Sequence, residues 1–200
     1  MNSRKSKAWT VSIVLGVLLA GCGFVRKPLV VDSTLNAATI DEIVLLPVLD
    51  ARPDPTLHVQ VARNVGDATL RWLRARGYFT LSAETFAQRP GTPLDLEMAT
   101  AQQLMPLAPK DARYFMLVQV LGLNVGDDNT GNTYDAKLAG VLVDRAESKI
   151  LWRDRAKGSS RLSGMLTVFS RGSRQYEAAV NASRALVESL PDRRNGAEKR

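Results

Sequence analysis

The stretch Ile43-Val44-Leu45-Leu46-Pro47-Val48-Leu49 decides the fold, together with the helical and strand-like stretches that come after it. An uninterrupted apolar run of this length is typical of a strand that is buried on both faces of a sheet. Pro47 has no backbone N–H to donate to a neighbouring strand. We therefore expect a bulge, a strand end or a local sheet edge at Pro47.

A helix is predicted over residues 57–76, because Val61, Val65, Ala68 and Trp72 recur at spacings of four, three and four. Gly77 suits the position that ends a helix, where a left-handed backbone favours glycine. A second strand is expected to begin at Tyr78-Phe79-Thr80-Leu81. These segments together predict a strand–helix–strand unit.

The rest of the chain predicts a short helix within residues 94–105, three strands and a final helix. Apolar spacing places the strands at 114–125, 134–144 and 150–157, and the final helix at 173–190. Trp72 is expected in the core. Trp152 is either in the core, which we favour, or an exposed aromatic anchor at an interface. We predict an α/β (α+β) fold with one mixed β-sheet of about five strands, on which two long helices and one short helix pack.

The composition is that of an ordinary globular domain, with 200 residues, 45% hydrophobic and 24% charged. The single cysteine, Cys22, excludes an intrachain disulfide and a cysteine-rich zinc site. The single histidine, His58, excludes a multi-histidine metal site. The sequence contains neither a nucleophile-elbow motif nor a phosphate-binding loop motif. We therefore expect no catalytic residues, no metal and no bound cofactor.

Two polar features remain as candidates for a function. His58 begins the predicted helix without an accompanying Ser or Cys motif, so we interpret it as a capping or buried-edge residue rather than a catalytic base. Asp50, Arg52 and Asp54 form a charged loop after the first strand, a place where α/β sheets carry functional loops. This loop is either a salt-linked turn, which we favour, or a partner-contact loop.

Residues 1–22 have the pattern of an export signal. Arg4, Lys5 and Lys7 precede 13 mostly apolar residues, 8–20, whereas a membrane-spanning helix needs about 20. Small residues then lead to the cysteine, in Leu19-Ala20-Gly21-Cys22. This segment resembles the lipobox of bacterial lipoprotein precursors. The alternative is an uncleaved signal anchor with a cysteine close to the membrane.

The lipobox resemblance implies cleavage by a signal peptidase between Gly21 and Cys22, with S-diacylglycerol and an N-acyl chain on Cys22. Since Gly23 rather than Asp follows Cys22, it also implies sorting to the periplasmic face of the outer membrane rather than retention in the inner membrane. The expected organisation is a cleaved signal peptide (1–21), a lipidated N-terminus and tether (22–39), a periplasmic α/β domain (40–191) and a disordered polar tail (192–200).

The pattern over about residues 43–190 resembles a group of small periplasmic domains. The group contains the curli-secretion lipoprotein, the lipoprotein activators of penicillin-binding proteins and the TolB amino-terminal domain. The resembling segments are residues 43–49, Arg76-Gly77-Tyr78, residues 114–121, and Leu142-Val143-Asp144 followed by Ile150-Leu151-Trp152. A weaker likeness, through Cys22-Gly23 and the strand–helix layout, is to the lipoprotein plug of the lipopolysaccharide translocon.

These resemblances imply a non-catalytic binding or assembly module of the cell envelope, anchored to the membrane by its lipid. Its partner would be another envelope protein or further copies of itself. The alternatives are a hydrolase acting on envelope material, with His58, Asp50 and Asp144 as residues to test, or a subunit of an oligomeric outer-membrane secretion or transport assembly.

The formal charge of +7 gives little support to a nucleic-acid partner. Arg4, Lys5 and Lys7 would leave with the signal peptide, so the mature chain has 24 basic and 20 acidic residues, a charge of +4. Two of these positive charges belong to residues 192–200, where four basic residues face two acidic ones. A domain with the remaining charge of +2 is ordinary.

Overall fold

The computed structural model describes residues 28–53, 60–88, 94–126, 133–160 and 171–194. Its elements, in chain order, are β1 (Val30–Val31), the 3-10 turn η1 (Ala37–Thr39), β2 (Glu42–Leu45), β3 (Leu49–Asp50), α2 (Val61–Ala75), β4 (Phe79–Ser82), α3 (Ala101–Leu104), the 3-10 turn η2 (Met105–Leu107), β5 (Tyr114–Gly126), β6 (Thr133–Asp144), β7 (Lys149–Ser160) and α4 (Arg171–Glu188).

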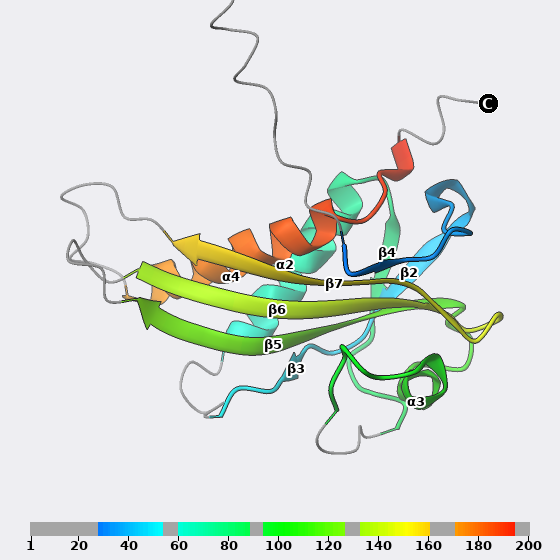
Figure 1. The fold of residues 1–200 in the computed structure, drawn as a ribbon, viewed down its shortest axis with the longest axis horizontal. Helices are drawn as coiled ribbons and strands as arrows, with labels where there is room; N and C mark the ends of the chain where they lie inside the picture. Colours follow the sequence, from blue (N-terminus) through cyan, green and yellow to red (C-terminus); the bar gives the residue numbers. More distant parts are fainter. Residues whose placement is uncertain (1–27, 54–59, 89–93, 127–132, 161–170, 195–200) are drawn as a thin grey trace, which may run out of the picture.

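One mixed sheet of seven strands forms the centre of the molecule, in the order β1-β7-β6-β5-β2-β4, with β3 beside β5. Helices α2 and α4 cover one face of the sheet, and the segment that contains α3 covers part of the other (Figure 1). The predicted α/β class is confirmed. The sheet has two strands more than expected, because β1 and β3 are only two residues long and too short to give a periodic signal.

Pro47 interrupts the first predicted strand and divides it into β2 and β3. Leu45 pairs with Met116, and Leu49 pairs with Gln119. Three residues of the first segment therefore face two residues of β5, which is the count of a β-bulge. The expectation of a bulge or a strand end at Pro47 is confirmed.

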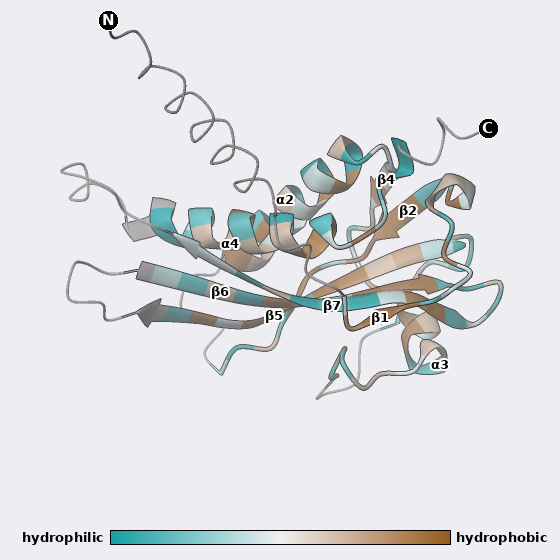
Figure 2. Ribbon diagram, turned by 45° about the horizontal axis from the view of Figure 1, so that its top comes forward, coloured by the Kyte–Doolittle hydropathy of each residue, from teal (hydrophilic) through white to brown (hydrophobic). Residues whose placement is uncertain are grey.

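Strand β6 divides its side chains between two cores, as its alternation predicts. Leu138 and Leu142 pack under the helices, and Val141 and Val143 pack on the other face, against the segment of α3. Trp152 is fully buried in the first core, as expected. In Figure 2 the brown, apolar colour concentrates in the sheet between the helices and α3.

Helix α4 lies unusually close to β7, because small residues meet where they touch. A Cβ atom added to Gly158 would stand 2.0 Å from the backbone N of Ala182 and 2.5 Å from the backbone O of Ala178. Ala178 and Ala182 are both fully buried. Only glycine fits at position 158 at this separation.

The short helix is much shorter than the predicted range of 94–105. Thr100 accepts a hydrogen bond from the backbone N–H of Gln103, and the Gln103 side chain accepts one from the backbone N–H of Thr100, so a capping box starts α3 at Ala101. Residues before it are held in the loop instead, since Gln119 Nε2 donates to the Leu94 carbonyl at 2.8 Å.

The segment predicted as a tether joins the folded domain from residue 28 onward. β1 pairs with β7 in antiparallel fashion, with Val30 opposite Arg153 and Val31 opposite Trp152. The Lys149 ammonium contacts the Asp32 carboxylate at 2.8 Å, and Ile40 is buried in the core. Residues 28–40 are therefore attached along the β7 side of the sheet, and the chain that can act as a free tether is correspondingly shorter.

At the other end of the chain, the first three residues of the predicted tail, 192–194, lie against the end of α2. The backbone N–H of Arg193 donates to the Arg76 carbonyl at 3.2 Å. Gly77, which ends α2, has a φ of 85°, so the expected role of this glycine as the C-terminal cap is confirmed. Residues 195–200 lie outside the described part.

Candidate functional site

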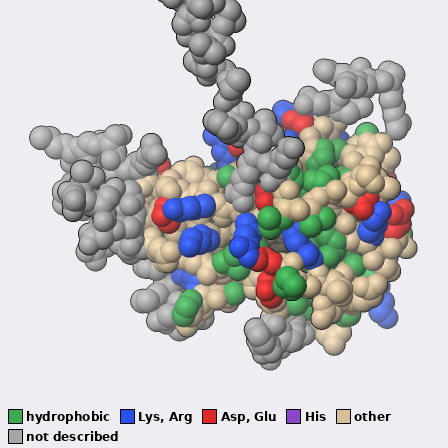
Figure 3. Space-filling view, in the orientation of Figure 1, with side chains coloured by type: hydrophobic (Ala, Val, Ile, Leu, Met, Phe, Trp, Pro, Cys, Tyr) green, Lys and Arg blue, Asp and Glu red, His purple; other side chains and the backbone are tan. Residues whose placement is uncertain are grey.

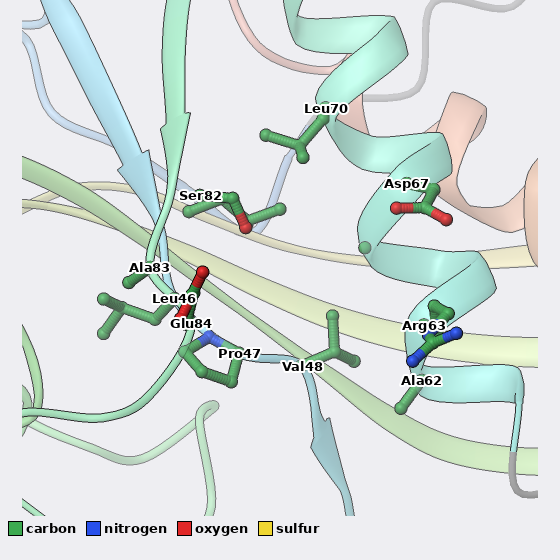
Figure 4. Close-up of a pocket in the computed structure, with 12 residues that line it drawn as sticks. Leu46, Pro47, Val48, Ala62, Arg63, Asp67, Leu70, Ser82, Ala83 and Glu84 are labelled. Atoms are coloured by element: carbon green, nitrogen blue, oxygen red, sulfur yellow. The ribbon is translucent and has the colours of Figure 1, made fainter.

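A solvent-open cavity of about 360 Å³ lies where the parallel strands β2 and β4 end. The space lies open because β2 ends before Pro47 and β4 ends at Ser82. Helix α2 closes it on the other side (Figure 4). Ligands of α/β proteins commonly bind at the carboxyl ends of parallel strands. The cavity is lined by residues 45–48, by Ala62, Arg63, Gly66, Asp67 and Leu70 of α2, and by residues 82–84.

The cavity has an apolar floor and a charged rim. Pro47 and Val48 form part of the floor, whereas Arg63 and Asp67 extend from α2 and Glu84 lies on the opposite side (Figure 4). All three charged residues are exposed. The only imidazole and the only thiol of the chain, those of His58 and Cys22, lie outside the described residues. The described lining can hold a small apolar group beneath a charged rim, and no nucleophile–base pair is assembled in it.

The predicted charged loop is a salt-linked turn in its described part. Arg52 Nε donates to Asp50 Oδ1 at 2.8 Å, and Arg52 Nη2 donates to Asp50 Oδ2 at 2.6 Å. Arg52 is buried, so this two-pronged pair serves to shape the loop. Asp54 lies outside the described residues. A role of this loop in partner contact stays a prediction.

Of the residues named for a hydrolase, Asp50 and Asp144 do not converge, and His58 lies outside the described residues. Asp50 is opposite Val120 of β5, and Asp144 is opposite Tyr114 at the start of the same strand. Six residues of strand separate the two carboxylates by about 20 Å. The Asp144 carboxylate accepts a hydrogen bond from the backbone N–H of Ala146 at 2.8 Å and is thereby occupied in shaping the turn before β7.

The described residues also offer no cluster of side chains suited to binding a metal ion. Over the described residues, no group of three or more His, Cys, Asp or Glu side chains is placed to hold a metal ion. Over the same residues, none of the helices combines the length and the apolar character that crossing a membrane requires.

Large exposed apolar side chains gather at the two opposite edges of the sheet. Leu29, Val30 and Val31 lie at the β1 edge, and Phe79 and Leu81 lie on β4 at the other. Met98 is on the segment beneath β7, which adjoins β1, and Tyr176 stands apart on α4. Single exposed apolar residues are ordinary, but grouped ones mark interaction surfaces.

The β4 edge is the feature that sequence reasoning missed. Phe79 is 59% exposed and Leu81 is 47% exposed, whereas Thr80 between them is buried and accepts a hydrogen bond from Arg74. The alternation of apolar and polar residues in β4 would place Phe79 and Leu81 toward a core. They are exposed because β4 is the outermost strand, and its local sequence does not show that position.

Comparison with known proteins gives a fold and no family. No protein-family model and no curated protein matches this chain. The structure of a dodecamer of a PelC variant from Paraburkholderia phytofirmans matches at 13% identity, over 82% of this chain and 95% of that chain, with a TM-score of 0.51. The two proteins share a fold.

Two further solved structures are similar at lower TM-scores. Lipoprotein GNA1162 from Neisseria meningitidis is 21% identical over 62% of this chain and 87% of that chain, with a TM-score of 0.44. Protein XCC0632 from Xanthomonas campestris is 10% identical over 87% of this chain and 99% of that chain, with a TM-score of 0.49. The resemblance to the curli-secretion, penicillin-binding-protein activator and TolB group stays a prediction.

Proposed function

We propose that this chain is a bacterial envelope lipoprotein, anchored through lipid on Cys22 to the periplasmic face of the outer membrane, that acts by binding rather than by catalysis. Its partner, in this proposal, is a further copy of the same chain, and the β4 edge is the binding surface. The observation that carries the proposal is the exposed, apolar edge strand β4.

The edge has the properties that strand-mediated association needs. Within the described residues, no strand pairs with the outer side of β4, so its backbone groups are available to another chain. Phe79 and Leu81 project from the same face of that strand and are both exposed. They offer apolar area to whatever strand or surface adds to the edge.

Self-association is supported by the related fold. The similar PelC protein is described as a dodecamer. In an assembly with closed symmetry, a patch that meets a different patch on the next copy generates a ring. The exposed β4 edge can serve as one of these two patches.

The anchor is tested by metabolic labelling with a fatty-acid analogue. The wild-type protein should be labelled, and Cys22→Ala should remain as an unlabelled precursor, because the thiol that forms the thioether is absent. A labelled Cys22→Ala protein would refute lipidation at this residue.

The assembly is tested by the mass of the detergent-extracted protein, measured by light scattering. The wild type should be an oligomer, and Leu81→Asp should dissociate it, because a carboxylate would be buried at the interface. Leu29→Asp is the matched control on the opposite edge and should keep the oligomer. A monomeric wild type, or an unchanged Leu81→Asp assembly, would contradict the proposal.

A further inference from the structure

The β1 edge carries apolar side chains that the fold does not use. Leu29 is 57% exposed, and Val30 and Val31 are also exposed although they lie in a strand. Met98, at 79% exposure, belongs to the segment beneath β7. Arg153 Nη1 donates to the Glu97 carbonyl at 2.6 Å, and Arg153 Nη2 donates to the Ala99 carbonyl.

Met98 and β1 thus lie on either side of one arginine. Val30 is directly opposite Arg153 in the strand pair, so both side chains point to the same face of the sheet. Met98 stands between the two carbonyls that the Arg153 guanidinium holds. Val31 is opposite Trp152 and points to the helix face instead. Leu29, Val30, Val31 and Met98 therefore border the β1 edge from both faces of the sheet, and we call them the β1 rim.

The length of chain between Cys22 and β1 limits how far a lipid on Cys22 can lie from this rim. Only seven residue steps separate Cys22 from Leu29, which span at most about 25 Å when fully extended and about 15 Å on average if flexible. The opposite edge, β4, is five strand spacings further away, roughly 24 Å. A lipid on Cys22 would therefore keep the β1 rim next to the bilayer and leave β4 free to face away from it.

The basic residues of β7 are mostly paired with acids, so the apolar area of the rim carries the case for contact with lipid. Strand β7 carries Lys149, Arg153, Arg155 and Lys157, and the acids that pair with three of them are Asp32, Glu97 and Asp135. The Arg153 guanidinium is held by two backbone carbonyls, which leave its positive charge in place. In Figure 3 blue and red side chains lie beside one another over this face. Interfacial binding depends on buried apolar area and on attraction to anionic lipids.

We infer that the β1 rim is a membrane-contact surface, which inserts into the interface of the bilayer that holds the Cys22 lipid. This inference rests on the proposed lipidation of Cys22. It assigns β1 a role beyond completing the sheet: the rim sets the orientation of the domain, with the sheet standing on its β1 edge and the β4 edge presented to other copies.

The test uses the lipidated protein in vesicles of phosphatidylethanolamine and phosphatidylglycerol. Because the Cys22 thiol is consumed by the lipid, an introduced cysteine is the only reactive one. An environment-sensitive fluorophore is attached to Leu29→Cys, to Met98→Cys, or to the control Glu84→Cys, which is exposed beyond β4. The emission is compared in vesicles with and without lipids brominated near the headgroup end of the acyl chains.

The fluorophore at 29 and at 98 should shift its emission to the blue and lose emission to the brominated lipids, and the fluorophore at 84 should keep its emission in the brominated vesicles. Adding Leu29→Asp to the Met98→Cys protein should restore the emission at 98. Because Leu29 is exposed, this change leaves the core intact, and circular dichroism checks that the fold is retained.

Equal, water-like emission at 29, 98 and 84 would overturn the inference. A blue shift without quenching by brominated lipid would also overturn it, because the rim would then be covered by protein. The mass of the N-terminal peptide, measured on the same sample, separates these failures from a failure of the anchor. An unmodified Cys22 there would overturn the proposed lipoprotein and the inference together.

Discussion

Tyr78 shows how one side chain closes the fold. It is the first residue after the glycine that ends α2, it is buried, and its hydroxyl donates to the Pro191 carbonyl at 2.7 Å. Arg76 Nη2 donates to the neighbouring Leu190 carbonyl at 2.5 Å. The ends of α2 and α4 are therefore joined at a single junction. Burial raises the pKa of Tyr78 to about 12, because the phenolate would lose its hydration.

The raised pKa predicts a loss of stability in alkali. The unfolded chain releases the Tyr78 proton near pH 10 and the folded chain near pH 12, so stability is fully present below pH 10 and falls as the pH rises through this window. In Tyr78→Phe, the fall in the free energy of unfolding should be smaller by about 2–3 kcal/mol. Urea denaturation at pH 8 and at pH 12 measures the difference. An alkaline fall as large as that of the wild type would contradict this role.

A second residue-scale prediction concerns Gly158, which lies against the backbone of α4. Gly158→Ala should lower the free energy of unfolding by about 3 kcal/mol or more, because the added methyl meets backbone atoms that cannot move aside singly. Gly122→Ala is the matched control in β5, where the nearest atom to an added Cβ is 3.9 Å away. Urea denaturation compares the two, and equal losses would show that α4 can move away from β7 at little cost.

At the scale of the element, β1 is held at its C-terminal end as well as by its strand pairing. The Asp32 backbone N–H donates to the Leu151 carbonyl at 2.9 Å, and the Asp32 carboxylate binds the Lys149 ammonium. Hydrogen bonds from Lys149 and Thr34 lower the pKa of Asp32 to about 2. A charged Asp32 therefore supports the attachment of β1 to β7.

The attachment of β1 to β7 should weaken in acid, when the Asp32 carboxylate becomes protonated. Its contribution is present above the ordinary carboxyl pKa of 3.8 and is lost as the pH falls through about 2. In Asp32→Asn, the amide of residue 32 should exchange its hydrogen faster than in the wild type at neutral pH. Asp41→Asn, at an exposed site, should leave that exchange unchanged. Equal exchange rates in the wild type and Asp32→Asn would show that the pairing of Val30 and Val31 with β7 holds β1 without the ion pair.

The long elements could be predicted from the sequence, and the short ones could not. The periodic patterns of α2 and α4 and the alternation of β6 extend over many residues, so each pattern is repeated enough to be read. β1 and β3 each span two residues. The short helix predicted within 94–105 is present, but it occupies only Ala101–Leu104 because Thr100 starts it late in that range. The loop before it is held by Gln119, which is distant in sequence.

At the scale of the whole molecule, the candidate surfaces follow from strand order. The sequence predicts the anchor at Cys22 from local residues, since a lipobox is a contiguous segment. By contrast, the exposure of Phe79 and Leu81 depends on β4 being outermost, and that depends on which strand pairs with which. The placement of β1 and β4 at opposite edges likewise comes from tertiary pairing, which single-strand patterns do not encode.

This placement gives the account its central claim: one edge of the sheet faces lipid and the other binds protein. Photo-crosslinking in intact cells tests it most directly, with a photoreactive amino acid at Leu81 in one variant and at Val31 in the other. Both positions are exposed, at 47% each. We expect adducts of the chain with itself from position 81 and no protein adducts from position 31. Protein adducts from position 31, or no self-adducts from position 81, would contradict the claim.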